Sequence, residues 1–156
     1  MNIAVTGTIG AGKSTVAREL CRLLPAEHCD VDTVCRNLLL KGAKGWHGVV
    51  AQWGQKYLNG SGELDRVSLR EDIFRDTIIR KKLEDILHPL ARRIVQEKMS
   101  ECAGREKILI VEVPLLYESG WHTDFDIVIT VSADNELCLK RIMARDNVSR
   151  EQAKMA

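Results

Sequence analysis

Four short segments with the character of β-strands, separated by longer helical patterns, organise the chain. They fall near residues 2–6, 27–30, 107–112 and 126–131, and the third and fourth contain uninterrupted apolar runs. Uninterrupted runs of this length are typical of strands buried on both faces of a parallel sheet. The intervening segments place apolar residues three and four positions apart, as amphipathic helices do. This alternation predicts an α/β fold with a central parallel sheet and two buried strands in its C-terminal half.

Caps and breakers indicate where several helices begin and end. Ser68 and Glu71 match the S-x-x-E capping box, so we expect a helix that has Ser68 as its N-cap. The longest helical pattern spans residues 80–102, and Pro89 is expected to kink or break it. Residues 115–118 are expected to start a short apolar helix.

The C-terminal part predicts two more helices. One covers residues 134–145, and its inward-facing residues are expected to be Leu137, Ile142 and Met143. Ser149 and Gln152 form a second capping-box pattern, which predicts a helix beginning near Arg150. That helix has barely two turns before Ala156, and a helix of this length is marginal alone. We therefore expect further sequence after residue 156.

Composition narrows the class of protein. The 156 residues fit one domain, and a net charge of +1 gives no reason to expect nucleic acid or a membrane surface as partner. The five cysteines are odd in number and contain no C-x-x-C pair, which favours a reducing compartment over a disulfide framework or zinc site. No signal peptide or membrane-spanning run is recognisable. A cytoplasmic protein, monomeric by default, is expected.

The segment from Gly7 to Ser14 matches G-x-x-x-x-G-K-[ST] between the first strand and the first helix. Such a loop wraps backbone N–H groups around a phosphate at a helix N-terminus. Lys13 would add a charge at the β- and γ-phosphates, and Ser14 could bind Mg²⁺. The motif predicts binding of ATP with Mg²⁺ by these residues: Gly7, Thr8, Ile9, Gly10, Ala11, Gly12, Lys13, Ser14 and Thr15.

Three carboxylates follow predicted strands. Asp30 and Asp32 come after the second strand, where they could cap a helix or face a ligand. Ligands of α/β proteins bind beyond the carboxyl ends of strands, which favours a site role for Asp32. Glu112 ends the third strand, where a carboxylate that assists Mg²⁺ would lie.

Several basic residues have both a structural and a functional interpretation. Arg141 and Arg145 share a helix face, either as solvated charges or as a clamp on the transferred phosphate. Arg66 could be solvated or could bind an anionic substrate. His88 precedes Pro89 and could be a core or hinge histidine rather than a functional one.

These motifs together resemble the dephospho-CoA kinase family along nearly the whole chain. Besides the loop, the matching elements are Asp30-Val31-Asp32, Gly62-Glu63-Leu64-Asp65-Arg66, Leu83-Glu84-Asp85-Ile86-Leu87-His88-Pro89, Val113-Pro114-Leu115-Leu116-Tyr117-Glu118 and the pair Arg141 and Arg145. The resemblance implies ATP-dependent phosphorylation of the ribose 3′-hydroxyl of dephospho-CoA, the last step of coenzyme A synthesis. It also implies a P-loop NTPase fold of three α/β/α layers with a helical substrate-binding insert and lid helices.

The resemblance also assigns regions and roles. The core would cover about 1–45 and 105–136, the CoA-binding helical region about 46–104 and a partial lid about 137–156. Asp32 resembles the candidate base for the 3′-hydroxyl, and Arg141 a lid arginine that faces the phosphates. Substrate-side positions would be Arg66, His88, Glu112 and Pro114. Where the family usually has Gln three residues before the lid arginine, this chain has Cys138.

Other functions stay open at this stage. The same scaffold could serve another small-molecule or nucleotide kinase, which the helical region would distinguish. A truncated, non-catalytic ATP-binding module is a further alternative. A GTPase is disfavoured, because the [NT]-K-x-D and D-x-x-G motifs are absent.

Overall fold

The computed structural model describes residues 1–154, which divide into two compact units. Residues 1–31 and the described residues from 98 onward form the first unit, and residues 32–97 form the second. The predicted division into core, CoA-binding region and lid stays a prediction. The last two residues of the predicted lid lie outside the described part of the chain.

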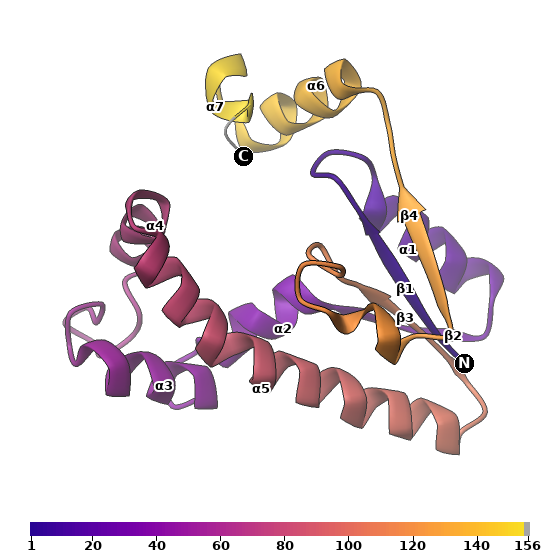
Figure 1. The fold of residues 1–156 in the computed structure, drawn as a ribbon, viewed down its shortest axis with the longest axis horizontal. Coiled ribbons are helices and arrows are strands. Elements are labelled where there is room, and N and C mark those ends of the chain that lie inside the picture. The colour runs from indigo at the N-terminus through magenta and orange to yellow at the C-terminus, as the bar shows by residue number, and fades with distance from the viewer. Residues whose placement is uncertain (155–156) are drawn as a thin grey trace. The chain divides into compact units, whose positions relative to one another are not determined.

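The first unit is built on a four-stranded, entirely parallel sheet (Figure 1). Its order is β2-β3-β1-β4, and the strands are β1 (Asn2–Gly7), β2 (Ala26–Asp30), β3 (Ile108–Glu112) and β4 (Ile127–Val131). The predicted parallel sheet and its four strands are thereby confirmed. Because all strands run the same way, their carboxyl ends meet at one edge, where Glu112 has Asp30 and Val5 as its Cα partners.

The central strands carry the core. Helix α1 (Lys13–Leu23) buries Ala17 against Ile3, Val5 and Ile110. The expectation of a second buried strand in the C-terminal half is wrong for β4, whose residues are exposed or only half-buried. The reason is position: within the described sheet β4 pairs only with β1, so it is an edge strand.

Two helices and a 3₁₀ turn complete the first unit. They are α6 (Asn135–Asp146), α7 (Arg150–Lys154) and the 3₁₀ helix Trp121–Asp124. The predicted box at α7 is confirmed: the Gln152 N–H donates to Ser149 Oγ at 3.2 Å, and the Ser149 N–H donates to Gln152 Oε1 at 2.9 Å.

Two details of this part differ from the sequence prediction. Leu137 is 42% exposed, and the neighbouring Cys138 is buried in its place together with Ile142. Residues 114–120 form turns rather than a helix. Gly120 takes a left-handed φ of 71°, which ends the segment after one helical hydrogen bond, from the Ser119 N–H to Leu115 O.

The second unit is helical. It contains α3 (Lys44–Trp53), α4 (Arg66–Arg75), nearly all of α2 (Val31–Leu38) and most of α5 (Thr77–Gly104). Of the two effects expected of Pro89, the break is wrong, because α5 is continuous through it, and the kink stays a prediction. Buried residues on both sides of the proline hold the helix together: Leu83, Leu87, Ala91 and Val95.

Helix α4 begins earlier than the capping-box pattern suggests. Its N-cap is Asp65, whose carboxylate accepts the N–H groups of Val67 and Ser68 and the Ser68 hydroxyl. These hydrogen bonds, above all that from the Ser68 side chain, lower the pKa of Asp65. The carboxylate accepts several donors at once, so Asp65 displaces Ser68 from the N-cap position.

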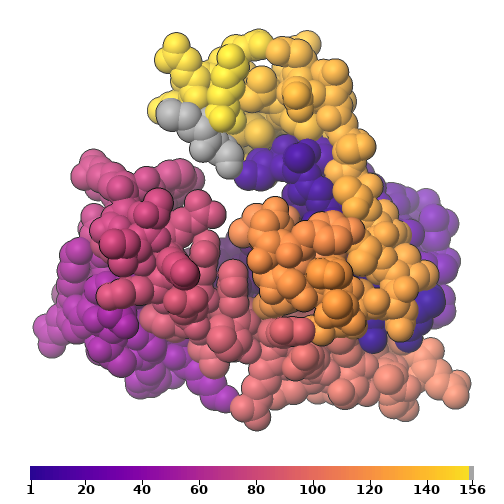
Figure 2. Space-filling model, in the orientation of Figure 1, coloured from indigo at the N-terminus to yellow at the C-terminus, as the bar shows by residue number. Residues whose placement is uncertain are grey.

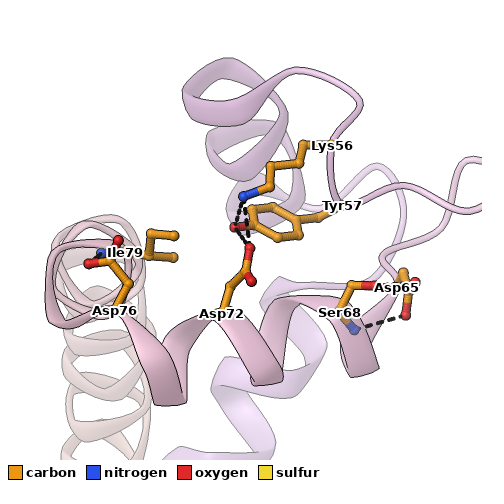
Figure 3. A network of polar contacts seen from close by, with 7 residues as sticks. All are labelled: Lys56, Tyr57, Asp65, Ser68, Asp72, Asp76 and Ile79. Atoms are coloured by element: carbon orange, nitrogen blue, oxygen red, sulfur yellow. Dashed lines mark hydrogen bonds and ion pairs between the residues drawn. The ribbon is translucent and has the colours of Figure 1, made fainter.

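A polar network fixes α4 to the segment that follows α3 (Figure 3). The Tyr57 hydroxyl donates to Asp72 Oδ2 at 2.8 Å, and Lys56 Nζ contacts the same oxygen at 2.7 Å. Tyr57 is 1% exposed, so the network covers a buried ring. Hydrogen bonds from Lys56 and Tyr57 lower the pKa of Asp72, and the Asp72 carboxylate raises the pKa of Lys56.

Within residues 1–154, none of the helices combines the length and apolar character needed to cross a bilayer. All five cysteines carry free thiols.

Candidate active site

The nucleotide loop joins β1 to α1. It needs glycine at two positions where its backbone lies very close to the backbone of another segment. A Cβ on Gly7 would lie 2.0 Å from Val131 O, and one on Gly10 would lie 2.7 Å from Cys138 O. Both glycines have positive φ, at 140° and 79°. The loop can therefore pack directly on the end of β4 and on α6, as Figure 2 shows for its indigo atoms beneath the yellow-orange helix.

Two cations lie on the carbonyl groups of this loop. Lys13 Nζ donates to Gly7 O at 2.9 Å and to Thr8 O at 3.1 Å. Arg141 Nη1, from α6, donates to Gly10 O and Ala11 O, both at 3.1 Å. The structure thus brings together Lys13 and Arg141, which the sequence separates by more than a hundred residues. Two positive charges beside a helix N-terminus suit a polyphosphate.

A buried carboxylate lies below the loop at the end of β3. Glu112 is 5% exposed. Its Oε2 accepts the Ser14 hydroxyl at 2.7 Å, and its Oε1 lies 2.8 Å from His28 Nε2. Burial first, and then the Glu112 charge, raise the pKa of the Cys21 thiol on α1. Ser14 is therefore in direct contact with Glu112, which is predicted both to assist Mg²⁺ and to be a substrate-side position.

His28 is a residue that the sequence reasoning missed. It lies on β2 two positions before Asp30, and residues two apart on a strand share a face. In register, His28 pairs with Ile110 and Asp30 with Glu112, so the alternation along β2 could have placed His28 beside Glu112 once strand order was known.

Two of the predicted substrate-side residues, Asp32 and Arg66, lie on helices of the second unit. Asp32 is exposed as the second residue of α2. Arg66 is exposed as the first residue of α4, and its Nη2 donates to Arg36 O at 3.3 Å. Arg36 in turn donates through Nε to the Asp32 carbonyl at 3.3 Å. The structure therefore groups Asp32, Arg36 and Arg66 around α2.

The remaining predicted site residues lie in three separate parts of the chain. His88 is half-buried in the middle of α5. Pro114 follows Val113, and its carbonyl accepts the Thr6 hydroxyl at 3.4 Å. Arg145 forms two hydrogen bonds of 2.7 Å with Asp146, which raise the pKa of its guanidinium. The structure thus places Arg141 on the loop and Arg145 on a neighbouring carboxylate.

Two side-chain oxygens near the loop could contribute to binding a metal ion. Among the described residues no group of three or more His, Cys, Asp or Glu side chains is arranged to bind an ion. The Ser14 hydroxyl and the Glu112 carboxylate nevertheless offer two oxygen ligands close together, the donor type that Mg²⁺ prefers.

Comparison with known proteins gives one consistent result. The dephospho-CoA kinase family profile matches residues 1–156. A dephospho-CoA kinase of Desulfotalea psychrophila is 43% identical over 148 residues, which cover 95% of this chain and 74% of that protein. A dephospho-CoA kinase of Moorella thermoacetica is 39% identical over 153 residues, covering 97% of this chain and 72% of that protein.

Solved structures agree with the sequence matches. TT1252 from Thermus thermophilus superposes with a TM-score of 0.81 at 31% identity, covering 99% of this chain and 76% of that one. The dephospho-CoA kinase from Campylobacter jejuni gives a TM-score of 0.67 at 32% identity, with 98% and 76% covered. The predicted three-layer P-loop fold is thereby confirmed.

Proposed function

The chain belongs to the dephospho-CoA kinase family, and we propose that it transfers the γ-phosphoryl group of ATP to the ribose 3′-hydroxyl of dephospho-CoA. Family membership confirms the predicted class of enzyme, a phosphotransferase that uses ATP. The residue roles below are proposals that rest on the geometry of the site.

The observation that carries the proposal is the pair of cations, Lys13 and Arg141, on the nucleotide loop. Phosphoryl transfer needs little covalent help from a protein, and catalysis consists mainly of positioning and of positive charge on the transferred group. Lys13 enters from α1 and Arg141 from α6, so charges from two separate helices would bracket a bound triphosphate. Arg141 can leave the loop carbonyls for the phosphate oxygens at little cost, because its own side chain is exposed.

Mg²⁺ fits the oxygen ligands on the adjacent edge of the sheet. Ser14 would bind the ion, and Glu112 would hold Ser14 or a water ligand of the ion. When bound with ATP, Mg²⁺ neutralises charge on the β- and γ-phosphates. The hydrogen bond to Glu112 would hold the Ser14 hydroxyl in position for the ion.

The acceptor side is assigned to the helical unit. Asp32 would orient the 3′-hydroxyl and accept its proton late in the reaction, since an exposed carboxylate is a weak base. Arg66 would bind an anionic part of dephospho-CoA. His88 would be a further substrate-side position in the helical unit, and Pro114 one in the first unit. Residues 46–104 would supply most of the CoA-binding surface.

A coupled ADP-release assay tests the proposal. We expect turnover with dephospho-CoA and none above background with nucleoside monophosphates. Turnover with the monophosphates alone would instead identify another kinase on this scaffold. ATP binding without turnover on any acceptor would identify a non-catalytic module. The free thiols support a reducing compartment, and we propose a cytoplasmic monomer.

A further inference from the structure

The buried carboxylate of Glu112 lies between a serine and a histidine, and the proposed function gives a role only to its contact with the serine. Glu112 contacts Ser14 through one oxygen and His28 through the other. These partners lie 98 and 84 residues away in the sequence, on α1 and β2 respectively. The carboxylate therefore connects three elements of the first unit.

Burial makes the second partner necessary. The Glu112 side chain is 7% exposed, whereas that of His28 is 35% exposed. A buried carboxylate is costly unless its oxygens are hydrogen-bonded. A second carboxylate, Asp30, is the Cα partner of Glu112 and shares its face of the sheet, which adds negative charge nearby.

We propose that His28 is a positioning residue for the metal-nucleotide complex. Its Nε2 fixes Glu112 Oε1, so that Oε2 stays directed at Ser14 and the Ser14 hydroxyl is presented to the Mg²⁺ that arrives with ATP. His28 itself touches neither nucleotide nor metal in this role. Loss of a group that orients a metal ligand typically costs about 10–100-fold in metal affinity or activity. His28 acts one contact further out, through Glu112, so the lower end of this range is expected. The proposal rests on the ATP and Mg²⁺ site of the proposed function, but not on the identity of the acceptor.

Two substitutions separate positioning from simple packing. His28→Ala removes the contact with Glu112, and His28→Gln keeps an N–H donor at a similar reach. Glu27→Ala is the matched control, because Glu27 is the neighbouring residue on β2, points to the opposite face and pairs with Lys107 at 2.9 Å. Thermal melting establishes that each variant is folded.

The measurement is calorimetric ATP affinity in EDTA and again in excess Mg²⁺. We expect His28→Ala to bind ATP in EDTA within about twofold of the unmodified protein, because Lys13 and the loop are unchanged. The gain in affinity on adding Mg²⁺ should fall by about 10-fold or more. His28→Gln should recover most of this gain, and Glu27→Ala should keep all of it.

An unchanged Mg²⁺ gain in folded His28→Ala would overturn the proposal, as would an equal loss in Glu27→Ala. The binding measurement contains no acceptor, so its outcome is independent of the proposed substrate. Failure of the unmodified enzyme to phosphorylate dephospho-CoA would refute the proposed function alone.

Discussion

The nucleotide loop and the helical unit differ in how far apart in the sequence their contacting polar residues lie. At the loop, Arg141 and Glu112 reach partners that lie 131 and 98 residues away in the sequence. In the helical unit, Asp65 caps α4 from three residues away, and Tyr57 reaches Asp72 from 15 residues away. The first region depends on the sheet to assemble it, whereas the second is assembled by neighbouring turns.

This difference predicts how each region responds to mutation. The loop region contains an almost fully buried carboxylate and glycines with positive φ that other residues rarely adopt, so changes there should affect nucleotide binding and catalysis. Contacts in the helical unit are hydrogen bonds between side chains close in the sequence, so changes there should affect stability by the modest contribution of each bond lost. Asp32 is the exception to this expectation, because it lies in the helical unit but is assigned to catalysis.

The largest effect is expected from Lys13→Ala. Losing the charge on the loop should lower turnover by about 100-fold or more and should weaken ATP binding. ADP release and calorimetry measure the two effects, with Lys44→Ala, an exposed lysine of α3, as the control. ATP affinity equal to that of the control would contradict the role of Lys13.

Asp32→Asn should lower turnover about as strongly but should leave ATP affinity nearly intact. A neutral amide cannot accept the hydroxyl proton, yet the nucleotide loop is unchanged. The same two assays apply, with Asp85→Asn on α5 as the matched control. Near-normal turnover would show that Asp32 is not the base. The expectation that changes in the helical unit affect stability would then hold for Asp32 as well.

Arg141→Ala should reduce kcat by about 10-fold or more, with a smaller change in KM for ATP. The reason is that its charge acts on the transferred group, while Lys13 and the loop still hold the nucleotide. Steady-state kinetics measure both constants, and Lys140→Ala removes a neighbouring exposed charge as the control. A change confined to KM would assign Arg141 to binding alone.

Tyr57→Phe should destabilise the helical unit without affecting the loop. The variant loses one hydrogen bond to Asp72, worth about 1 kcal/mol, which corresponds to a Tm lower by about 2–4 °C. ATP affinity should be unchanged. Tyr117→Phe alters an exposed ring and should shift Tm by less than about 1 °C. Equal shifts in the two variants would mean that the Asp72 contact is not stabilising.

The smallest effect concerns acid pH. The pKa of Asp72 is lowered in the folded protein by Lys56 first and by Tyr57 second. Its stabilisation is therefore present above its ordinary value of 3.8 and is lost as pH falls through the lower folded pKa. The difference in Tm between the unmodified protein and Asp72→Asn should shrink from about pH 6 to about pH 3. A constant difference across this range would contradict a role for the ionised carboxylate.

Local patterns predicted most elements of the fold. Some failures had a local cause, as at the N-cap of α4, where Asp65 replaces Ser68, and others arose where distant parts of the chain decide the outcome. The Ser149 and Gln152 box formed because both of its partners are local. Pro89 did not interrupt α5, since buried residues on either side outweigh its local preference. The burial of β4 was wrong because an apolar run does not reveal whether its strand lies at an edge.

The sequence by itself determined the family, the parallel sheet and the nucleotide loop. Each depends on residue types at fixed spacing, and the glycines of the loop are needed for backbone geometry that the spacing already implies. Only the tertiary structure decided that Arg141 lies on the loop and that His28 holds the buried Glu112. The physical reason is that these contacts depend on strand order and helix packing, which bring together residues that no local pattern relates.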